Sequence, residues 1–269
     1  MVQLYDWVKK QAIGLKINKR GTQVYILSYP KSGRTWLRLL IGKAICDRYN
    51  LPESLMIETY QITSQAGLLR THFSHDYSSI LSGFPYHRMP TDKSEYADTK
   101  VLFVYREIKD VLVSSYFQAT KRTGRFEGPI SEFIRSDKFG VKKIVTFYNS
   151  WHEQQHMPQA FMALSYEAMH QNPQEALRQT LEFMGMADIE EGLLETAVNF
   201  AAFNNMKKLE SSGFFKDDKM RPKDESDTES YKVRKGKVGG FTEYLSQADV
   251  EYIDRTVAEM GCPFLLGNK

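Results

Sequence analysis

The sequence predicts an α/β fold: one domain, residues 1–269, with a mainly parallel central sheet flanked by helices. Three short apolar runs, at residues 24–27, 101–105 and 161–166, have the length and the β-branched or aromatic content of buried strands. Segments with apolar residues at helical spacing separate these runs. Buried strands that alternate with helices build a parallel sheet covered on both faces, and 269 residues suffice for one large core.

The first strand leads through a tight loop into a helix. The loop, residues 29–33, contains Pro30 and Gly33, and helical spacing begins at Thr35. The first N–H groups of a helix have no partner within it and lie at its positive end, so a strand, a loop and a helix in this order bind anions. The ammonium of Lys31 and the hydroxyls of Ser32 and Thr35 add donors. The alternative is an ordinary connection with a solvated lysine; a nucleotide triphosphate loop does not fit, because here the lysine precedes the glycine.

The remaining elements are predicted in order along the chain. Residues 67–73 form a short strand that ends in polar residues, and 74–99 an irregular stretch with a helical turn near 78–81. Asn172 and Pro173 start a helix that Gly185 ends. The other predicted helices are 1–14, 109–120, 139–156, 190–200, 204–210 and 247–260. Residues 211–230 are highly charged without apolar periodicity, which predicts a mobile flap.

Composition narrows the class of protein. The fractions of 42% hydrophobic and 26% charged residues are those of a soluble globular protein. A net charge of +3 argues against general nucleic-acid binding but allows a local positive pocket. The two cysteines, Cys46 and Cys262, offer no metal-ligand spacing. No apolar run is long enough to span a membrane, and the charged residues near the start do not fit a signal peptide, so we expect a cytoplasmic protein without membrane contact.

Two further stretches have phosphate-binding chemistry. Arg106 stands at the carboxyl end of a buried strand, where ligands bind in open α/β sheets, and Ser114 follows in the next helix. An arginine fork and a hydroxyl suit a terminal phosphate; the alternative is an arginine paired with Glu107 or Asp110. Residues 231–241 hold four cations and three glycines, which suits a phosphate clamp in which glycine lets the backbone approach an anion. The alternative there is a solvated charged face.

The first loop resembles the 5′-phosphosulfate loop of the sulfotransferases that use 3′-phosphoadenosine 5′-phosphosulfate (PAPS). It reads Tyr29-Pro30-Lys31-Ser32-Gly33-Arg34-Thr35-Trp36, with Arg34 where the family usually has Thr. The resemblance implies that Lys31, Ser32, Gly33, Arg34, Thr35 and Trp36 hold the 5′-phosphate and lie near the adenine. Arg106 and Ser114 stand at the spacing of the family's 3′-phosphate motif.

The other family motifs follow in family order. Arg234, Lys235 and Gly236 resemble the Arg-Lys-Gly-x-x-Gly motif, which implies 3′-phosphate contacts, although the family's next Gly-Asp-Trp is Gly239-Gly240-Phe241 here. Tyr166 resembles the tyrosine that contacts adenine; without the family it reads equally as a core residue. Phe203 and Met206 resemble the Phe-x-x-Met near the adenine, preceded by Ala201 and Ala202 where Thr and Ser are common.

The catalytic base is expected to be a histidine, because a group that titrates near neutrality can take up the acceptor's proton. Arg70-Thr71-His72-Phe73 resembles the family's Lys-Thr-His-Leu, whose histidine is the base. His72 is therefore the predicted base, with His75 and Asp76 as runners-up. Lys31 would stabilise charge on the leaving phosphate oxygen.

The resemblance implies a PAPS-dependent sulfotransferase that transfers a sulfuryl group to a hydroxyl or amine of a small-molecule acceptor. Adenosine 3′,5′-bisphosphate is then the product, and no metal is needed. Acceptor loops are expected at 74–99, 121–129 and 211–230, whose Phe, Tyr and Met residues suit an apolar or aromatic acceptor. The alternatives are a nucleotide kinase, for which the sequence offers neither a triphosphate loop nor Mg²⁺ ligands, and a non-catalytic protein that binds the bisphosphate. Of the family's dimer motif only Glu251 remains, so no oligomeric state is predicted.

Overall fold

The sheet is parallel throughout, as the sequence predicts. The computed structural model describes residues 21–212, 214, 227–231 and 233–266, so the predicted helix at 1–14 and most of the predicted flap lie outside the described residues. Four strands pair in the order β2-β1-β3-β4. They are β1 Val24–Ser28, β2 Thr71–Ser74, β3 Lys100–Tyr105 and β4 Ala160–Ser165.

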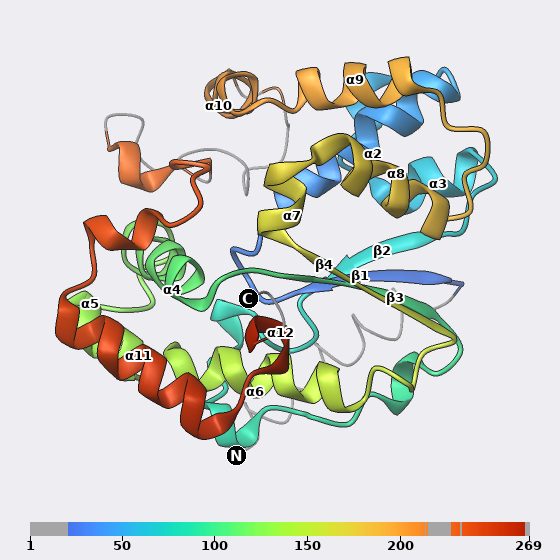
Figure 1. The fold of residues 1–269 in the computed structure, drawn as a ribbon. Helices are drawn as coiled ribbons and strands as arrows, with labels where there is room; N and C mark the ends of the chain where they lie inside the picture. The colour runs from blue at the N-terminus through green and yellow to red at the C-terminus, as the bar shows by residue number, and fades with distance from the viewer. Residues whose placement is uncertain (1–20, 213, 215–226, 232, 267–269) are drawn as a thin grey trace, which may run out of the picture.

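Helices cover both faces of the sheet, which Figure 1 shows nearly edge-on. The helices above it in that view are α2 Arg34–Arg48, α3 Thr59–Gln65, α7 Tyr166–Gln171, α8 Pro173–Phe183, α9 Glu191–Phe200 and α10 Phe203–Ser211. Those on the other side are α4 Ile108–Phe117, α5 Ile130–Arg135, α6 Val141–Glu153, α11 Gln247–Met260 and α12 Pro263–Leu266.

Successive strand residues belong to two separate cores. Ile26 and Leu102 pack with the helices above the sheet, whereas Leu27 and Phe103 pack with those below it. All four side chains are completely buried, because neighbouring residues of a strand point to opposite faces and both faces are covered. This two-sided burial explains why the central strands read as uninterrupted apolar runs.

Local capping decides where α7 and α8 begin. The Asn172 side chain accepts a hydrogen bond from the Glu175 N–H, which confirms the predicted start of α8. The Ser165 side chain accepts from the Ala168 N–H and caps α7. Tyr166 is therefore the first residue of a helix and not the last residue of a strand, and this cap turns its side chain into the space beyond the sheet edge.

The sequence did not predict α3, α5, α7 or α12, which span only four to seven residues each and are too short to show helical periodicity. The helix predicted at 109–120 ends at Phe117 and continues as a wider turn over Gln118–Arg122. The irregular stretch 74–99 contains three 3₁₀ turns, at Ile80–Ser82, Tyr86–Arg88 and Ser94–Tyr96.

Lys143 on α6 predicts an unusual pH dependence of stability. Its side chain is completely buried, and within the described part of the chain its Nζ atom has no hydrogen-bond partner. Burial lowers the pKa of this ammonium to about 8, because a charge in an apolar interior is unfavourable. Lys143→Met is therefore expected to raise the free energy of unfolding by roughly 2–3 kcal/mol at neutral pH, since one pKa unit corresponds to about 1.4 kcal/mol.

The difference in the free energy of unfolding between Lys143→Met and the wild-type protein should shrink as the pH rises. Between about pH 8 and the usual lysine pKa of 10.5, the unfolded chain holds a proton that the folded protein has released. The wild-type protein therefore gains stability with rising pH in this window, and Lys143→Met does not. Denaturant unfolding of both proteins at several pH values measures the difference; a gap that does not change with pH would contradict the assignment.

Candidate active site

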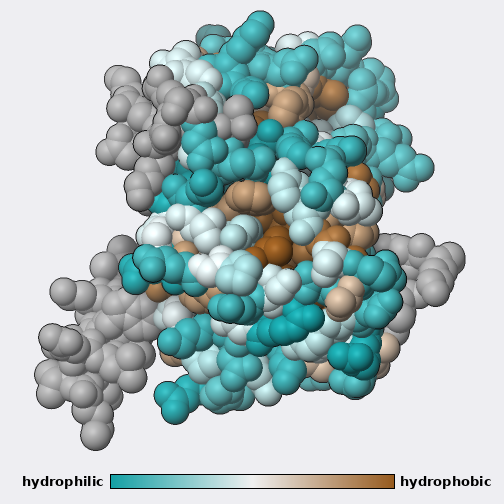
Figure 2. Space-filling view, turned by 90° about the vertical axis from the view of Figure 1, so that its left-hand side faces the viewer, coloured by the Kyte–Doolittle hydropathy of each residue, from teal (hydrophilic) through white to brown (hydrophobic). Residues whose placement is uncertain are grey.

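A cavity of about 960 Å³ lies at the carboxyl ends of the strands. Its walls come from five stretches that are far apart in the sequence: 30–38, 75–81, 106–123, 166–206 and 233–240. Figure 2 shows this end of the molecule, where apolar brown residues lie at the middle of the face between hydrophilic teal residues above and below. Ligands of open α/β sheets bind at this edge, so the separate motifs of the sequence meet at one site.

The loop after β1 forms one wall of the cavity. Lys31 and Gly33 have left-handed backbone conformations, with φ of 73° and 90°, and α2 begins directly afterwards. No side chain caps its first N–H groups, so the positive end of a 15-residue helix is available to an anion. The Lys31 Nζ atom lies 3.4 Å from the Gln118 Oε1 atom, which ties the loop to the turn after α4.

Gly33 packs against Tyr166 and leaves no room for a side chain. A Cβ atom added to Gly33 would lie 2.4 Å from the Tyr166 ring. Gly33→Ala is therefore expected to displace this ring and to lower the affinity for adenosine 3′,5′-bisphosphate by roughly tenfold, in addition to a backbone cost of about 1 kcal/mol. Titration calorimetry and thermal unfolding measure the two effects.

Gly67 offers a matched control for this prediction. It also has a left-handed backbone, with φ of 69°, but an added Cβ would meet nothing within 4 Å, and it does not line the cavity. Gly67→Ala should lose stability to a similar degree and keep its affinity for the bisphosphate. Equal affinities of the two variants would show that the contact with Tyr166 is irrelevant to binding.

Contacts of its backbone and of its guanidinium hold Arg106 in place. The Tyr148 hydroxyl accepts from the Arg106 N–H and donates to its carbonyl, both at 3.0 Å. The guanidinium lies 4.1 Å from the centre of the Tyr166 ring and 3.2 Å from the Asp110 carboxylate, and it donates to the Lys237 carbonyl at 2.9 Å. An arginine fixed in this way presents its remaining donors to the cavity without losing side-chain freedom on binding.

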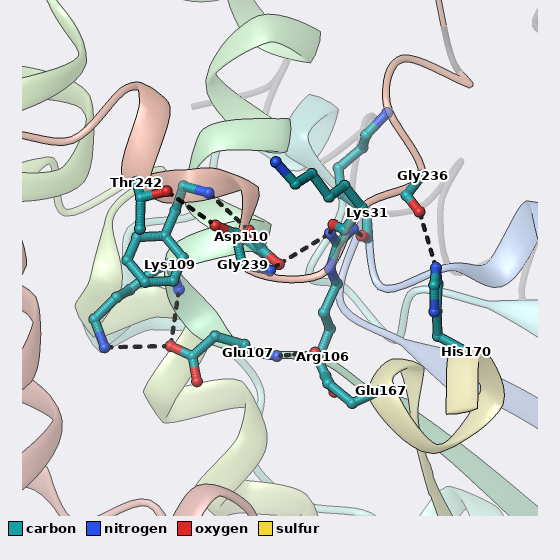
Figure 3. Close-up of polar contacts among 12 residues, drawn as sticks. Lys31, Arg106, Glu107, Lys109, Asp110, Glu167, His170, Gly236, Gly239 and Thr242 are labelled. Atoms are coloured by element: carbon teal, nitrogen blue, oxygen red, sulfur yellow. Dashed lines mark hydrogen bonds and ion pairs between the residues drawn. The ribbon is translucent and has the colours of Figure 1, made fainter. Parts of the chain in front are cut away.

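Asp110 joins two of the predicted motifs. Its carboxylate accepts from the backbone N–H groups of Gly239 and Phe241 at 2.9 and 3.0 Å, while it pairs with Arg106 (Figure 3). The glycine-rich segment is thereby anchored to α4. The pairing of Arg106 with Asp110 was one of the alternatives open from the sequence, whereas the contacts with Gly239 and Phe241 had no local signal.

The cations of the 234–236 motif have carboxylate partners in this structure. Arg234 lies 3.0 Å from Glu229 and donates to the Tyr244 hydroxyl at 2.7 Å, and Lys235 pairs with Glu243. Both cations still line the cavity. A phosphate at this position would have to share the two cations with these carboxylates or displace the carboxylates. Each contact between a cation and the phosphate therefore contributes less net free energy to binding.

Aromatic side chains surround the part of the cavity next to Arg106. The rings of Trp36, Tyr166 and His170 lie about 6 Å from one another, and Phe203 and Met206 line the same space. The His170 Nε2 atom is 3.2 Å from the Gly236 carbonyl oxygen, which links this group to the glycine-rich segment (Figure 3). Aromatic and thioether groups at such spacing suit a flat heterocycle such as a nucleobase.

The two candidate histidines lie at different levels of the sheet. β2 continues to Ser74, and His72 pairs in register with Tyr25, the second residue of β1. Its ring packs edge-on against Tyr25 with centroids 6.1 Å apart, and it is not among the residues that line the cavity. His75 follows the last strand residue, lines the cavity with Lys31, and has its Nδ1 atom 2.9 Å from the Ser28 carbonyl oxygen.

This geometry corrects the expected position of His72. A base would have to lie at the sheet edge beside Lys31, but His72 is the second residue of β2, the strand continues to Ser74, and the edge is reached at His75. Burial and the nearby charges of Arg38 and Arg34 lower the pKa of His72, so it stays neutral near pH 7.

Most of the predicted nucleotide-binding residues do line one cavity. Ser32 is the exception, because its side chain is completely buried and lies outside the lining. Those that line it are Lys31, Gly33, Arg34, Thr35, Trp36, Arg106, Ser114, Tyr166, Phe203, Met206, Arg234, Lys235 and Gly236. Further polar residues of the lining, to which the sequence assigned no role in binding, include Arg38, Gln118, Arg122 and His170.

The lining is strongly electropositive. Among the described residues that form it, Asp110 is the one carboxylate, against eight lysines and arginines. Burial and the neighbouring charge of Arg38 lower the pKa of Arg34 to about 9. Such a cavity attracts a ligand with several negative charges.

The described residues contain neither a metal-binding cluster nor a membrane-spanning helix. No cluster of three or more His, Cys, Asp or Glu side chains in the described ranges could hold a metal ion. Within the same ranges, no helix has both the length and the apolar character needed to cross a membrane.

Comparison with solved structures supports the fold. Mouse sulfotransferase SULT7A1 in complex with PAP aligns with a TM-score of 0.61 at 19% identity, over 89% of this chain and 84% of that one. A retinol dehydratase in complex with androsterone and PAP aligns with a TM-score of 0.60 at 16% identity, over 89% and 80% of the two chains.

Comparison of sequences identifies the family. Flavonol 3-sulfotransferase of Flaveria bidentis is 24% identical over 255 residues, 88% of this chain and 80% of that protein. Cytosolic sulfotransferase 17 of Arabidopsis thaliana is 27% identical over 265 residues, 89% and 74% of the two chains. The family model of the sulfotransferase domain matches residues 21–260. This chain therefore belongs to the sulfotransferase domain family.

Proposed function

We propose that this protein transfers a sulfuryl group from PAPS to a hydroxyl or amine group of a small-molecule acceptor and releases adenosine 3′,5′-bisphosphate. The observation that carries the proposal is the meeting of the loop 31–36, Arg106 with Ser114, and residues 234–236 around one electropositive cavity. Three anion-binding stretches on one aromatic-lined cavity match a nucleotide with phosphates at two separate positions. The solved relatives that carry PAP are consistent with this donor.

Each group has a proposed role in binding the donor. The first turn of α2 and Lys31 hold the 5′-phosphosulfate, and Lys31 stabilises the negative charge that forms on the bridging phosphate oxygen. Arg106, Ser114 and residues 234–236 hold the 3′-phosphate. The adenine lies among Trp36, Tyr166, Phe203 and Met206.

We propose His75 as the base in place of His72. In the tautomer that donates Nδ1–H to the Ser28 carbonyl, Nε2 is the nitrogen that accepts a proton. The acceptor oxygen attacks sulfur while its proton passes to Nε2; the bond between sulfur and the bridging oxygen breaks, and the bisphosphate keeps that electron pair. Asp76, the other runner-up, is only 2% exposed and its carboxylate already accepts three hydrogen bonds, which argues against it as the base.

The acceptor is proposed to have an apolar body, as the sequence suggested. Ile80 and Leu81 line the cavity beside His75, and Leu81 is 54% exposed. Arg34 and Arg38 line the same cavity, so an acceptor that also carries a negative group would be accommodated. The curated relatives include flavonol sulfotransferases and cytosolic sulfotransferases, which supports a hydroxylated aromatic acceptor and a cytosolic location.

Transfer of ³⁵S from labelled PAPS to a panel of phenols, alcohols, amines and hydroxylated acids tests the proposal. We expect labelled product with at least one acceptor, and loss of transfer in Lys31→Met. Binding of the bisphosphate without transfer to any acceptor would favour a non-catalytic binding protein, whereas transfer of phosphate from labelled ATP would favour a kinase.

A further inference from the structure

A buried polar cluster is centred on Asp76, the residue that follows His75 in the chain. The carboxylate of Asp76 is at its centre and accepts three hydrogen bonds from buried side chains: Lys93 Nζ at 2.7 Å, Trp151 Nε1 at 2.8 Å and the Tyr96 hydroxyl at 2.9 Å. All three donor residues are completely buried. They come from the segment before β3 and from α6, so the carboxylate joins the turn after β2 to two other parts of the molecule.

The turn that starts at His75 has a backbone that must be held in place. Asp76 and Tyr77 are both left-handed, with φ of 43° and 65°, a conformation that residues other than glycine seldom adopt. The His75 carbonyl accepts from both the N–H and the hydroxyl of Ser78, at 2.8 and 2.6 Å, and the Asp76 N–H donates to the Ser74 hydroxyl. These contacts and the buried carboxylate determine where His75 leaves the strand.

A buried ion pair is a poor source of stability. The cost of removing two charges from water is comparable to their attraction, and apolar replacements are often as stable. None of the four cluster residues lines the cavity, so their effect on a ligand is indirect, and His75 is the lining residue adjacent to Asp76 in the chain. A fully hydrogen-bonded buried cluster is, however, well suited to hold one backbone conformation.

We propose that Asp76 is a positioning residue for His75. Its buried hydrogen bonds hold residues 75–77 so that His75 Nδ1 stays at the Ser28 carbonyl and the ring faces the cavity beside Lys31. The proposal rests on the proposed role of His75 as the base. It assigns no contact with substrate to Asp76, Lys93, Tyr96 or Trp151.

Asp76→Asn tests the proposal because it removes the charge and keeps the size of the side chain. We expect kcat to fall roughly 10–100-fold while the affinity for the bisphosphate changes less than about twofold, since only the base is displaced. In a His75→Ala background the same substitution should cost almost nothing further, as expected of residues that act as a unit. A loss of similar size in both backgrounds would overturn the proposal.

The tautomer of His75 gives a readout that needs no catalysis. In ¹⁵N-labelled wild-type protein we expect the Nδ1–H form of His75, and in Asp76→Asn a mixture of both forms. The His75 signals are identified by their absence from His75→Gln. An unchanged tautomer in Asp76→Asn overturns the proposal. If His75→Ala keeps its activity, the proposed base is wrong, but the tautomer still tests positioning on its own.

Asp249 provides a matched control. It is also 2% exposed and its carboxylate accepts from Ser131, Ser246 and Arg135, but it lies on α11 and outside the cavity lining. Asp249→Asn should lower the melting temperature without changing kcat or the tautomer of His75. If the Asp76 and Asp249 variants have the same effects on kcat and on this tautomer, the cluster has only a structural role.

Tyr96→Phe is the second variant, for the case in which Asp76→Asn does not fold. It removes one of the three hydrogen bonds to the carboxylate and should change kcat and the tautomer in the same direction by a smaller amount.

Discussion

His75→Ala is expected to lower kcat by roughly 10²–10⁴, which is the usual contribution of a general base. The affinity for adenosine 3′,5′-bisphosphate should barely change, because His75 is not one of the residues proposed to hold the phosphates or the adenine. A loss in kcat without a loss in nucleotide affinity is the signature of an interaction made in the transition state. Steady-state rates with the best acceptor, together with titration calorimetry, measure both quantities.

His72→Ala is the matched control for this prediction. The two histidines lie three residues apart, but His72 packs on Tyr25 and does not line the cavity. We expect its replacement to lower kcat less than about tenfold and to reduce stability through the lost ring contact. An active His75→Ala together with an inactive His72→Ala would reverse the assignment. If both variants stay active, the acceptor's proton leaves by another route, such as water.

The second large effect concerns the 3′-phosphate. Adenosine 3′,5′-bisphosphate is expected to bind roughly 10²–10⁴ times more tightly than adenosine 5′-monophosphate, because each charge-assisted hydrogen bond contributes about 1.5–3 kcal/mol. Arg106 is held by Asp110 and Tyr148 before any ligand binds, so its contact should be near the upper end of that range. Arg234 and Lys235 have their own carboxylate partners and should contribute less.

Single variants test how the binding free energy of the 3′-phosphate is divided between Arg106 and Arg234. Arg106→Met should remove most of the preference for the bisphosphate, Arg234→Met a smaller part, and neither should change the affinity for the monophosphate to a comparable extent. Arg178 on α8 pairs with Glu191 outside the cavity, and its replacement by methionine should leave both affinities unchanged. Calorimetric titrations that give equal affinities for the two nucleotides would refute the 3′-phosphate assignment.

The sequence by itself determined the strands, the longer helices and the tight loop between β1 and α2. Those predictions rest on local signals: continuous apolar runs for strands covered on both faces, the Asn172 cap with Pro173 for α8, and the turn residues between β1 and α2. Each signal arises from neighbours along the chain, and none requires knowledge of what packs against it. The motifs at 106–114 and 234–236 were recognisable for the same reason.

The tertiary structure alone decided which histidine reaches the cavity and what holds it there. The end of β2 depends on its pairing with β1, and the pairing of Tyr25 with His72 leaves His75 at the sheet edge. The link between Asp110 and Gly239 spans 129 residues, and that between Asp76 and Trp151 spans 75. No local pattern encodes such contacts, because they form only when the helices have packed on the sheet, and it is this packing that turns separate motifs into one site.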